Sequence, residues 1–393
     1  MNDYVNHGIL MVVGSYHPEV TGGATQCRLL IRALKEKFGF MVLASTRDTE
    51  LPRRNEVDGV YVTRIPVQLE SRVSFFKAFF KFLSFLLNCR KNFRIIHMHG
   101  FTTKSVLLLF VSKLFRKKVI VTLTSIGHED PDSMKARGSF LYHFFSKADM
   151  FIGVSKQFEK LYQSSGLPTD RFRLIPNSVD TKRFSPISKE EKVSLREQLG
   201  LPLGLKLILF VGHFSREKCP DVLIDAWKGH VADTYVDTGV VFIGATDPGH
   251  YEVDTGLVEG IRRSARSHRR ERMFFVERTH EIEKYYRTAD IYVMPTLREG
   301  LPCAMLEAMS CELPVVVSRL EGVTDWVVEN GVNGLLISPG NGGELSEALI
   351  RLLGDSELSN MLGKKARETI KKRFRVEEMA GKYEKLYNSS SIN

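Results

Sequence analysis

The chain has 393 residues, which is too long for one compact core and predicts two domains of about 190 residues each. Its hydrophobic fraction of 43%, charged fraction of 26% and net charge of +10 are compatible with a globular protein. Five scattered cysteines without a C-x-x-C pair argue against a disulfide framework and a cysteine zinc site, and they favour a reducing cytoplasm. Neither a membrane-spanning helix nor a secretory signal is expected, because no run of 18 apolar residues and no cationic leader is found.

The first half of the chain alternates short apolar runs with helical patterns. Such alternation predicts an α/β domain with a parallel sheet covered by helices on both faces, and we expect it to span residues 1–185. The predicted strands are Ile9–Val13, Met41–Ala44, Val60–Ile65, Ile95–Met98, Val119–Leu123, Phe151–Val154 and Arg173–Ile175, and the predicted helices are Ala24–Lys37, Val73–Asn88, Lys104–Phe115 and Lys156–Ser164.

A polar stretch with several prolines, roughly residues 176–204, is interpreted as the connection to a second domain. The strand and helix alternation then restarts and predicts a second doubly wound domain over residues 205–375. Its predicted strands are Leu207–Val211, Val240–Ile243, Met273–Val276, Ile291–Met294, Val315–Val317 and Leu335–Ile337.

The positive charge is concentrated in one part of the first half. Ser71 to His128 contains eleven lysine and arginine residues and no aspartate or glutamate. Within it, the Val73–Asn88 helix carries six phenylalanines and three leucines beside Lys77 and Lys81, as in helices that lie in a membrane interface. The alternative is a core helix with two snorkelling lysines. Nucleic acid is not an expected partner, because no nucleic-acid-binding motif accompanies the charge.

Two carboxylates lie eight positions apart around a predicted strand-to-helix turn. Glu299 follows the Ile291–Met294 strand beside Gly300, and Glu307 lies about one and a half turns into a helix that opens near Pro302. Both can point toward the carboxyl end of the strand, where ligands of open α/β sheets bind. Each carboxylate can accept two hydrogen bonds, which suits vicinal hydroxyl groups. The alternative is a surface loop and an amphipathic helix with two solvated glutamates.

This segment, EGLPCAMLEAMSCELPVV, resembles the Glu-x7-Glu motif of retaining nucleotide-sugar glycosyltransferases of the GT-B fold, family four. The resemblance implies two Rossmann-like domains that face a cleft, with the donor in the second domain and the acceptor in the first. It implies that Glu299 and the amides of Gly300 and Leu301 hold the donor sugar, and that Glu307 holds the ribose. It also implies that the closing helix, residues 376–393, returns to the first domain.

Gly212 to Trp227 resembles the family's G-R-x-x-x-x-K-G phosphate element, with Lys218 at the lysine position. A lysine ahead of a helix adds a full positive charge to the partial charge of the helix start, which suits a diphosphate. The sequence departs from the pattern at His213, where arginine is usual, and at Cys219, where glycine is usual. A histidine in the diphosphate site implies pH-dependent donor binding.

Gly22 and Gly23 open the first predicted helix and resemble the family's glycine loop, which faces the donor phosphates. A plain turn is the alternative. The loop lacks G-x-G-x-x-G and the second strand lacks the acid that binds an NAD ribose, so no dinucleotide cofactor is expected.

The first domain offers few candidates for acid-base chemistry. Where the family often has Thr-x-His-Gly, Ile126 takes the histidine position and His128 follows two places later; His128 is kept as a catalytic candidate. His97 and His99 alternate on one strand without a third ligand nearby, so no metal site is expected.

The resemblance thus predicts a metal-independent, cofactor-free enzyme that moves a hexosyl group from a nucleoside diphosphate sugar to a hydroxyl with retention, using Lys218, Glu299 and His128. The basic, Phe-rich segment predicts a lipid-linked acceptor at an anionic membrane surface, in surface polysaccharide or glycolipid synthesis at the cytoplasmic side of the inner membrane. Two alternatives stay open. One is another GT-B enzyme, a sugar-nucleotide 2-epimerase or an inverting transferase, for which His99, His128, Glu129 and Asp130 are the available acids and bases. The other is a non-catalytic nucleotide-sugar binding protein.

Overall fold

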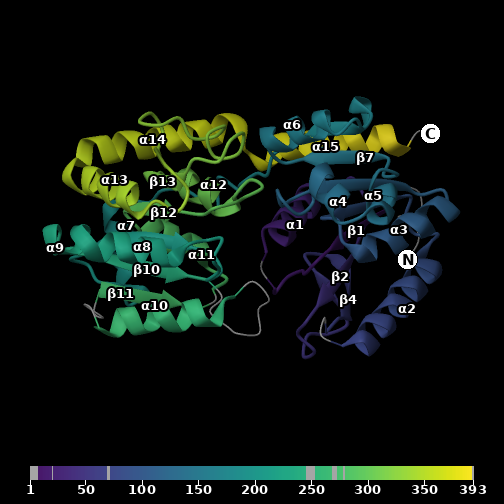
Figure 1. The fold of residues 1–393 in the computed structure, drawn as a ribbon, viewed down its shortest axis with the longest axis horizontal. Coiled ribbons are helices and arrows are strands. Elements are labelled where there is room, and N and C mark those ends of the chain that lie inside the picture. The colour runs from purple at the N-terminus through teal and green to yellow at the C-terminus, as the bar shows by residue number, and fades with distance from the viewer. Residues whose placement is uncertain are drawn as a thin grey trace. The chain divides into compact units, whose positions relative to one another are not determined.

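The computed structural model describes residues 8–19, 21–68, 71–244, 253–267, 272–277 and 279–391 (Figure 1). The chain divides into two compact units: unit 1 is Met1–Asn177 with Val376–Asn393, and unit 2 is Ser178–Arg375. The division falls before residue 178, whereas the sequence analysis extends the first domain to residue 185. Residues 1–7 of the predicted first domain and residues 392–393 of the predicted closing helix lie outside the described residues.

Unit 1 is built on an eight-stranded sheet in the order β3-β4-β2-β1-β5-β6-β7-β8, with all pairs parallel except β3 and β4. The antiparallel edge strand β3 is absent from the sequence prediction, because its four residues, RNEV, contain no apolar run. The strands are β1 (Ile9–Val13), β2 (Phe40–Thr46), β3 (Arg54–Val57), β4 (Val60–Pro66), β5 (Ile95–His99), β6 (Lys118–Leu123), β7 (Met150–Gly153) and β8 (Phe172–Leu174).

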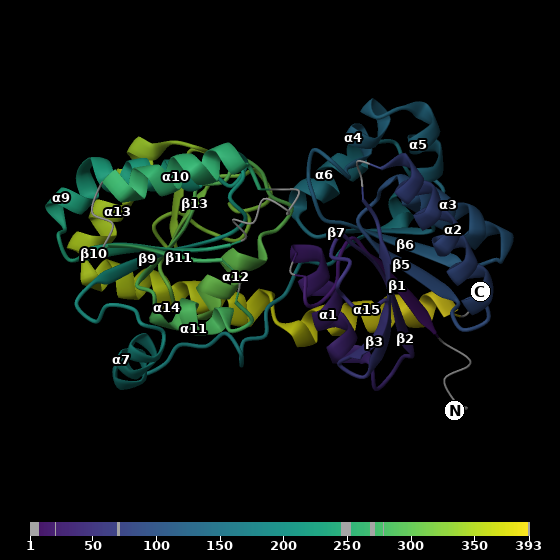
Figure 2. The same cartoon turned by 90° about the horizontal axis from the view of Figure 1, so that it is seen from below.

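Helices cover both faces of this sheet. Figure 2 shows α1 and α15 on one face and α2 and α3 on the other. The C-terminal helix is part of the core of unit 1, because Met379, Tyr383 and Tyr387 pack among residues of β1, β2 and α1. The helices are α1 (Gly22–Leu34), α2 (Arg72–Cys89), α3 (Thr103–Leu114), α4 (Pro131–Ala136), α5 (Ser139–Phe145), α6 (Lys156–Ser164) and α15 (Val376–Ser391), with a 3-10 turn at Thr169–Arg171.

The Phe-rich helix α2 has apolar side chains on its exposed side as well as on its buried side. Phe82 and Leu86 are buried, whereas Phe76 and Phe80 are each 63% exposed. The interpretation of α2 as a plain core helix is therefore wrong for this second group of phenylalanines. The side chain of Phe75 lies outside the described residues. No helix in the described part of the chain is long and apolar enough to cross a membrane.

Unit 2 contains a six-stranded, fully parallel sheet in the order β11-β10-β9-β12-β13-β14. The strands are β9 (Lys206–Val211), β10 (Thr238–Ile243), β11 (Met273–Val276), β12 (Ile291–Met294), β13 (Val315–Ser318) and β14 (Leu335–Ile337). With the sheet of unit 1, this confirms the predicted α/β fold of two Rossmann-like, doubly wound domains.

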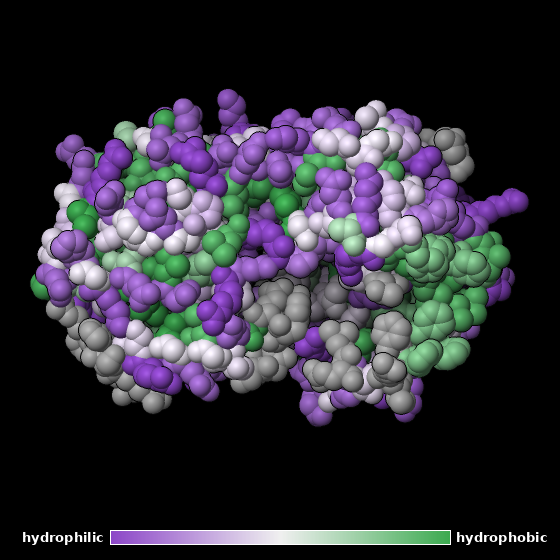
Figure 3. All heavy atoms as spheres, in the orientation of Figure 1, coloured by the Kyte–Doolittle hydropathy of each residue, from purple (hydrophilic) through white to green (hydrophobic). Residues whose placement is uncertain are grey.

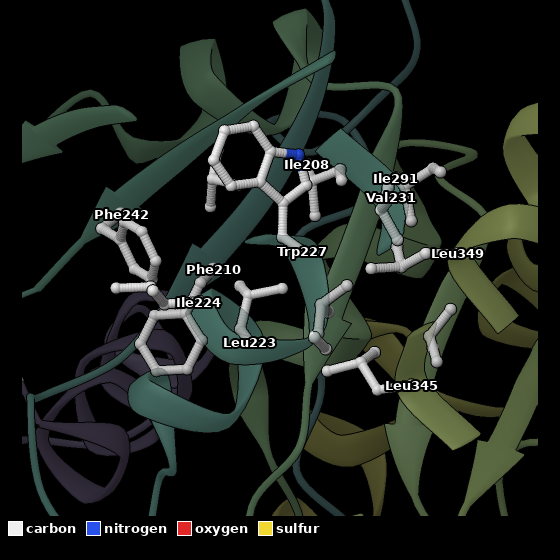
Figure 4. Close-up of a cluster of buried hydrophobic side chains, with 14 of the residues drawn as sticks. Ile208, Phe210, Leu223, Ile224, Trp227, Val231, Phe242, Ile291, Leu345 and Leu349 are labelled. Carbon is white, nitrogen blue, oxygen red and sulfur yellow. The ribbon is translucent and has the colours of Figure 1, made fainter. Parts of the chain in front are cut away.

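The core of unit 2 forms where α8 and α13 pack on the sheet. Figure 4 shows Trp227 beside Ile208, in one cluster with Leu345 and Leu349 of α13. The indole Nε1 donates to Thr238 Oγ1 at 3.1 Å, which satisfies the only polar atom of a fully buried side chain. The helices are α7 (Lys189–Gln198), α8 (Pro220–Ala226), a π-turn at Trp227–Val231, α9 (Ala232–Thr234), α10 (Thr255–Ser267), α11 (Ile282–Thr288), α12 (Cys303–Ser310), α13 (Gly342–Gly354) and α14 (Ser356–Arg373).

Helix α7 lies in the stretch that the sequence analysis interprets as a polar connection. Ser188 and Glu191 form a capping box at its start, the sequence signal that identifies such a helix despite its high charge. Arg196 is buried and binds Asp290 Oδ2 at 2.7 Å and Thr288 O at 3.0 Å, so α7 is attached to the sheet of unit 2 by ionic and polar contacts.

Candidate functional site

The candidate site in unit 2 centres on an ion pair between two loops. Strands β9 and β12 are neighbours in parallel register, with Ile208 opposite Ile291, so their carboxyl ends emerge side by side. Lys218 follows β9 and Glu299 follows β12, and Lys218 Nζ contacts Glu299 Oε1. The Glu299 side chain is 12% exposed and that of Lys218 is 28% exposed. The structure thus brings together two of the predicted catalytic residues at the carboxyl edge of the sheet, the edge where open α/β sheets bind ligands.

Hydrogen bonds between these loops hold the pair in place. Glu217 O accepts from Leu297 N at 2.8 Å and from Thr296 Oγ1 at 2.7 Å. Arg298 also forms an ion pair with the carboxylate of Glu217. Because Glu217 and residues 296–298, which directly precede Lys218 and Glu299, are bonded across the loops, the two side chains are positioned before any ligand arrives.

The backbone conformation at Cys219 explains why glycine is usual at this position of the phosphate element. It has a φ of +51°, in the left-handed region, and directly precedes Pro220 at the first turn of α8. A non-glycine residue in this region costs about 1–3 kcal/mol. Its Sγ lies 3.1 Å from Arg216 O, and burial raises the pKa of the thiol to about 11, so Cys219 is held as a neutral side chain.

His213 is partly buried in the loop that begins directly after β9. The preceding Gly212 donates to Ile243 O at 2.8 Å, and Gly244 packs so tightly on Gly212 that a Cβ on Gly244 would lie 1.7 Å from Gly212 O. Ser215 N donates to His213 O at 2.9 Å and Lys218 N donates to Ser215 O at 3.1 Å. The predicted diphosphate-binding residues therefore share one short, hydrogen-bonded turn.

Glu307 is the fifth residue of α12, which starts after Pro302 as predicted. Burial raises the pKa of Glu307 to about 7, while the neighbouring Tyr286 hydroxyl and Arg183 oppose that rise. Tyr286 and Tyr292 are fully buried, with ring centres 6.0 Å apart. Burial, followed by the charges of Glu299 and Glu307, raises the pKa of Tyr292 well above its ordinary value. Both glutamates thus act on one buried tyrosine, and neither is a freely solvated surface group.

The sequence analysis does not single out Tyr286 and Tyr292, because an aromatic residue in an apolar run is normally core. Gly300 and Leu301, which follow Glu299, are buried at the entrance to α12. Among the described residues, no group of three histidine, cysteine, aspartate or glutamate side chains is arranged to hold a metal ion.

The remaining predicted site residues belong to unit 1. Gly22 and Gly23 open α1 after Thr21, whose hydroxyl accepts from Ala24 N at 3.3 Å, and a Cβ on Gly23 would meet no atom within 4 Å. His128 is exposed in the turn before α4. The space beside Gly23 and the exposure of His128 leave both accessible to a ligand.

The two acids after His128 have structural partners. Glu129 Oε2 accepts from Thr124 N at 2.8 Å and from Thr124 Oγ1 at 2.9 Å, and Gly100, at a φ of +94°, makes room for this carboxylate. Asp130 caps α4 by accepting from Ser133 N at 3.0 Å and from Gly127 N at 2.6 Å. Both carboxylates are therefore used to shape the loop.

The rings of His97 and His99 are tilted by 32° with centres 4.5 Å apart, and of the two only His97 has hydrogen-bond partners for its ring nitrogens among the described residues. His97 bonds to Tyr387 Oη at 2.7 Å and to Thr122 Oγ1 at 2.8 Å, which ties β5 and β6 to α15. Neither ring nitrogen of His99 has a hydrogen-bond partner in the described part of the chain, and burial lowers its pKa to about 4. His97 is structural, while His99 lines a small cavity with Thr124 and Asn177.

Comparisons with known proteins identify the family of this chain. The family model for "Glycosyl transferases group 1" matches residues 191–369, and the model for "Glycosyltransferase Family 4" matches residues 20–183. N-acetyl-alpha-D-glucosaminyl L-malate synthase of Bacillus anthracis is 22% identical over 300 residues, 76% of this chain and 75% of the relative.

Two solved structures show the same fold. Sucrose-phosphate synthase of Thermosynechococcus elongatus matches 98% of this chain and 99% of its own with a TM-score of 0.79 and 23% identity. Anabaena HepE in complex with UDP and glucose matches 97% of this chain and 99% of its own with a TM-score of 0.77 and 19% identity. The chain therefore belongs to glycosyltransferase family four, the glycosyl transferases group 1, and is a glycosyltransferase of the GT-B fold.

Proposed function

We propose that this glycosyltransferase moves a hexosyl group from a nucleoside diphosphate sugar to an acceptor hydroxyl with retention of the anomeric configuration. The observation that carries the proposal is the Lys218–Glu299 ion pair at the carboxyl ends of β9 and β12, with Glu307 partly buried in the following helix. UDP and glucose, named in the HepE complex, are the kind of donor components that this site suits.

In the proposed site, each charged group has one task. Lys218 and His213 bind the diphosphate, Glu299 with the amides of Gly300 and Leu301 binds the sugar, and Glu307 binds the ribose. Gly22 and Gly23 belong to the loop that approaches the phosphates. Because Lys218 is paired with Glu299, an arriving diphosphate gives Lys218 a new partner and releases a carboxylate oxygen for the sugar hydroxyls.

The reaction then breaks the bond between the anomeric carbon and the diphosphate oxygen. Negative charge builds on the departing diphosphate, and Lys218 stabilises it. The acceptor oxygen bonds to the anomeric carbon on the same face, and its proton passes to the departing phosphate oxygen. The protein needs no nucleophile of its own for this step, and His128 is assigned to contacts with the reacting sugar.

The contacts of the first unit favour the transferase over the epimerase and the inverting transferase. Those reactions need acids and bases that are free to exchange protons, whereas Glu129 and Asp130 are engaged by local hydrogen bonds. His99, the remaining candidate with His128, has a pKa lowered to about 4 by burial, which makes it a weak base at neutral pH.

The surface of α2 and α3 supports a lipid-linked acceptor. Phe76 and Phe80 on α2 and Phe110 and Leu114 on α3 are each at least 60% exposed, and Figure 3 shows a hydrophobic area over these two helices. Eleven cations without acidic residues surround it in sequence. An apolar surface flanked by cations fits an anionic bilayer, so we place the enzyme at the cytoplasmic membrane face, in surface polysaccharide or glycolipid synthesis.

A screen of nucleotide sugars tests the proposal, with release of the nucleoside diphosphate as the first measurement. The product of a turned-over donor is then examined by NMR for the configuration of the new glycosidic bond. Retention is expected. An inverted product or a 2-epimer supports the corresponding alternative, and donor binding without any turnover supports a binding protein.

A further inference from the structure

Lys104 presents an amino group at the carboxyl edge of the unit 1 sheet. It is the second residue of α3, and its Nζ donates to Ser45 Oγ at 2.6 Å and reaches Val13 O at 3.4 Å. The amino group also lies 5.7 Å from the centre of the Phe82 ring. These partners are neutral, and no carboxylate of the described residues forms an ion pair with Lys104.

The surroundings make this an unusual lysine. Lys113 on the same helix is paired with Asp149 at 2.8 Å and half exposed, which is an ordinary arrangement. Burial lowers the pKa of Lys104 to about 8, and no neighbouring charge opposes it. A desolvated cation without a counter-charge is costly, and an anion placed beside it would recover part of that cost.

The position of Lys104 is one where ligands bind in doubly wound sheets. Strand β2 lies on one side of β1 and β5 lies on the other, so the strand order reverses at β1. Lys104 lies at this reversal, because α3 follows β5. Gly14, directly after Val13, is exposed, and a Cβ added to it would meet no atom within 4 Å. The backbone at Gly14, next to the carbonyl that Lys104 reaches, is thus open to an incoming molecule.

We propose that Lys104 and Ser45 form a subsite for an anionic group of the acceptor, a phosphate or a carboxylate. Ser45 Oγ accepts from Lys104, so its own hydrogen is available to an anion oxygen. The inference rests on the proposed function and narrows the acceptor to an anionic molecule. Phe82 connects the subsite to α2, which also bears the exposed Phe76 and Phe80, so a lipid phosphate can bind here as well as a free sugar phosphate.

Methyl NMR of the full-length protein with 13C-dimethylated lysines tests this subsite directly. The Lys104 resonance is assigned by its loss in Lys104→Arg and titrated with pH, first alone and then with inorganic phosphate. An anion within contact distance raises a lysine pKa, so the Lys104 titration should move up by about one unit while that of Lys113 stays in place. Glucose 6-phosphate and dihexanoyl phosphatidic acid are then compared to separate the two sources of phosphate.

Malate serves as the carboxylate probe beside these three phosphate probes. The subsite is overturned if the Lys104 resonance responds to none of the four. It is also overturned if Lys113 shifts equally, because such a shift would report ionic strength alone. Calorimetry of UDP and GDP binding to the unmodified protein tests the proposed function separately. A phosphate response without nucleotide binding sustains the subsite and overturns the donor assignment. Nucleotide binding with an unresponsive Lys104 overturns the subsite only.

Discussion

Lys218 Nζ contacts Glu299 Oε1, so the residue expected to bind the donor diphosphate and the residue expected to bind the donor sugar are ion-paired with each other. Each is the partner of the other until a donor supplies phosphate oxygens to one and hydroxyl groups to the other. In the proposed site, donor binding is an exchange of partners, and removal of either residue takes from the other the charged group that it contacts.

Replacement of Glu299 by glutamine should lower turnover by at least about tenfold, or about 1.4 kcal/mol of barrier, because an amide cannot accept hydroxyl donors with both of its heteroatoms. Nucleotide release is the measurement and the thermal midpoint is the check on folding. Glu347→Gln, on the exposed side of α13 in the same unit, is the matched control. Wild-type turnover in Glu299→Gln would remove the donor-sugar assignment.

Lys218→Ala should weaken UDP binding by about tenfold or more and leave the weaker binding of uridine unchanged, because the lysine acts on the diphosphate. Calorimetric titration with both ligands measures the two effects separately. Lys364→Ala, at an exposed position of α14, changes the net charge equally without touching the site. An equal loss for UDP in both variants would point to general electrostatics instead.

Glu307→Gln should flatten the dependence of stability on pH. Burial raises the pKa of Glu307 from 4.5 to about 7, so between these values the native state binds more protons than the unfolded state. The free energy of unfolding then falls as pH rises through this range. From pH 5 to pH 8 we expect the wild type to lose about 1–2 kcal/mol more than the variant, after allowance for partial exposure.

Urea unfolding at the two pH values measures this difference, and parallel losses in both proteins would show that Glu307 ionises as freely when folded as when unfolded. The same variant tests the ribose assignment. Wild type should prefer UDP to 2′-deoxy-UDP, and Glu307→Gln should bind the two more equally.

His213→Arg should make donor binding less dependent on pH. In the wild type, affinity should fall as pH rises through the range in which a histidine loses its charge, whereas arginine stays charged throughout. Affinity for UDP measured at pH 6 and pH 8 in both proteins decides the matter. Identical pH profiles would make His213 a structural residue of the turn.

The protein should sediment with anionic but not with neutral vesicles at low salt, and high salt should release it. Lys77→Glu with Lys81→Glu should abolish sedimentation by charge, and Phe76→Ser with Phe80→Ser should weaken it by loss of exposed apolar surface. Lys364→Glu with Lys365→Glu on α14 is the charge-matched control. If the wild type remains in the supernatant with anionic vesicles, the acceptor is a water-soluble molecule.

The strands of continuous apolar sequence are predicted best. Ile9–Val13, Met273–Val276, Ile291–Met294 and Leu335–Ile337 have the predicted bounds, because buried parallel strands are apolar on both faces. Strand β3 and helix α7 are missed because their residues are polar. Strand β3 is held in its hairpin by the Asp58–Gly59 turn, and α7 is held by the contacts of Arg196.

The candidate site residues can be proposed from the sequence, whereas the contacts between them cannot. Lys218 and Glu299 are 81 residues apart, and their contact depends on β12 lying beside β9, which the chain order does not reveal. The burial of Glu307 against Tyr286 is likewise a property of the packed fold. A lysine at a helix start normally reads as solvated, so Lys104 becomes conspicuous only once its neutral partners are known.

Helix α15 fills the core of unit 1, although residues 178–375 of unit 2 separate it from the rest of that unit. During synthesis, unit 2 is therefore complete while the first 177 residues still expose the apolar surface that Tyr383 and Tyr387 will cover. The amino-terminal domain usually folds first during synthesis. Here unit 1 is completed last, when α15 packs into its core. A nascent chain stalled before residue 376 should contain a protease-resistant second unit beside an incompletely folded first one.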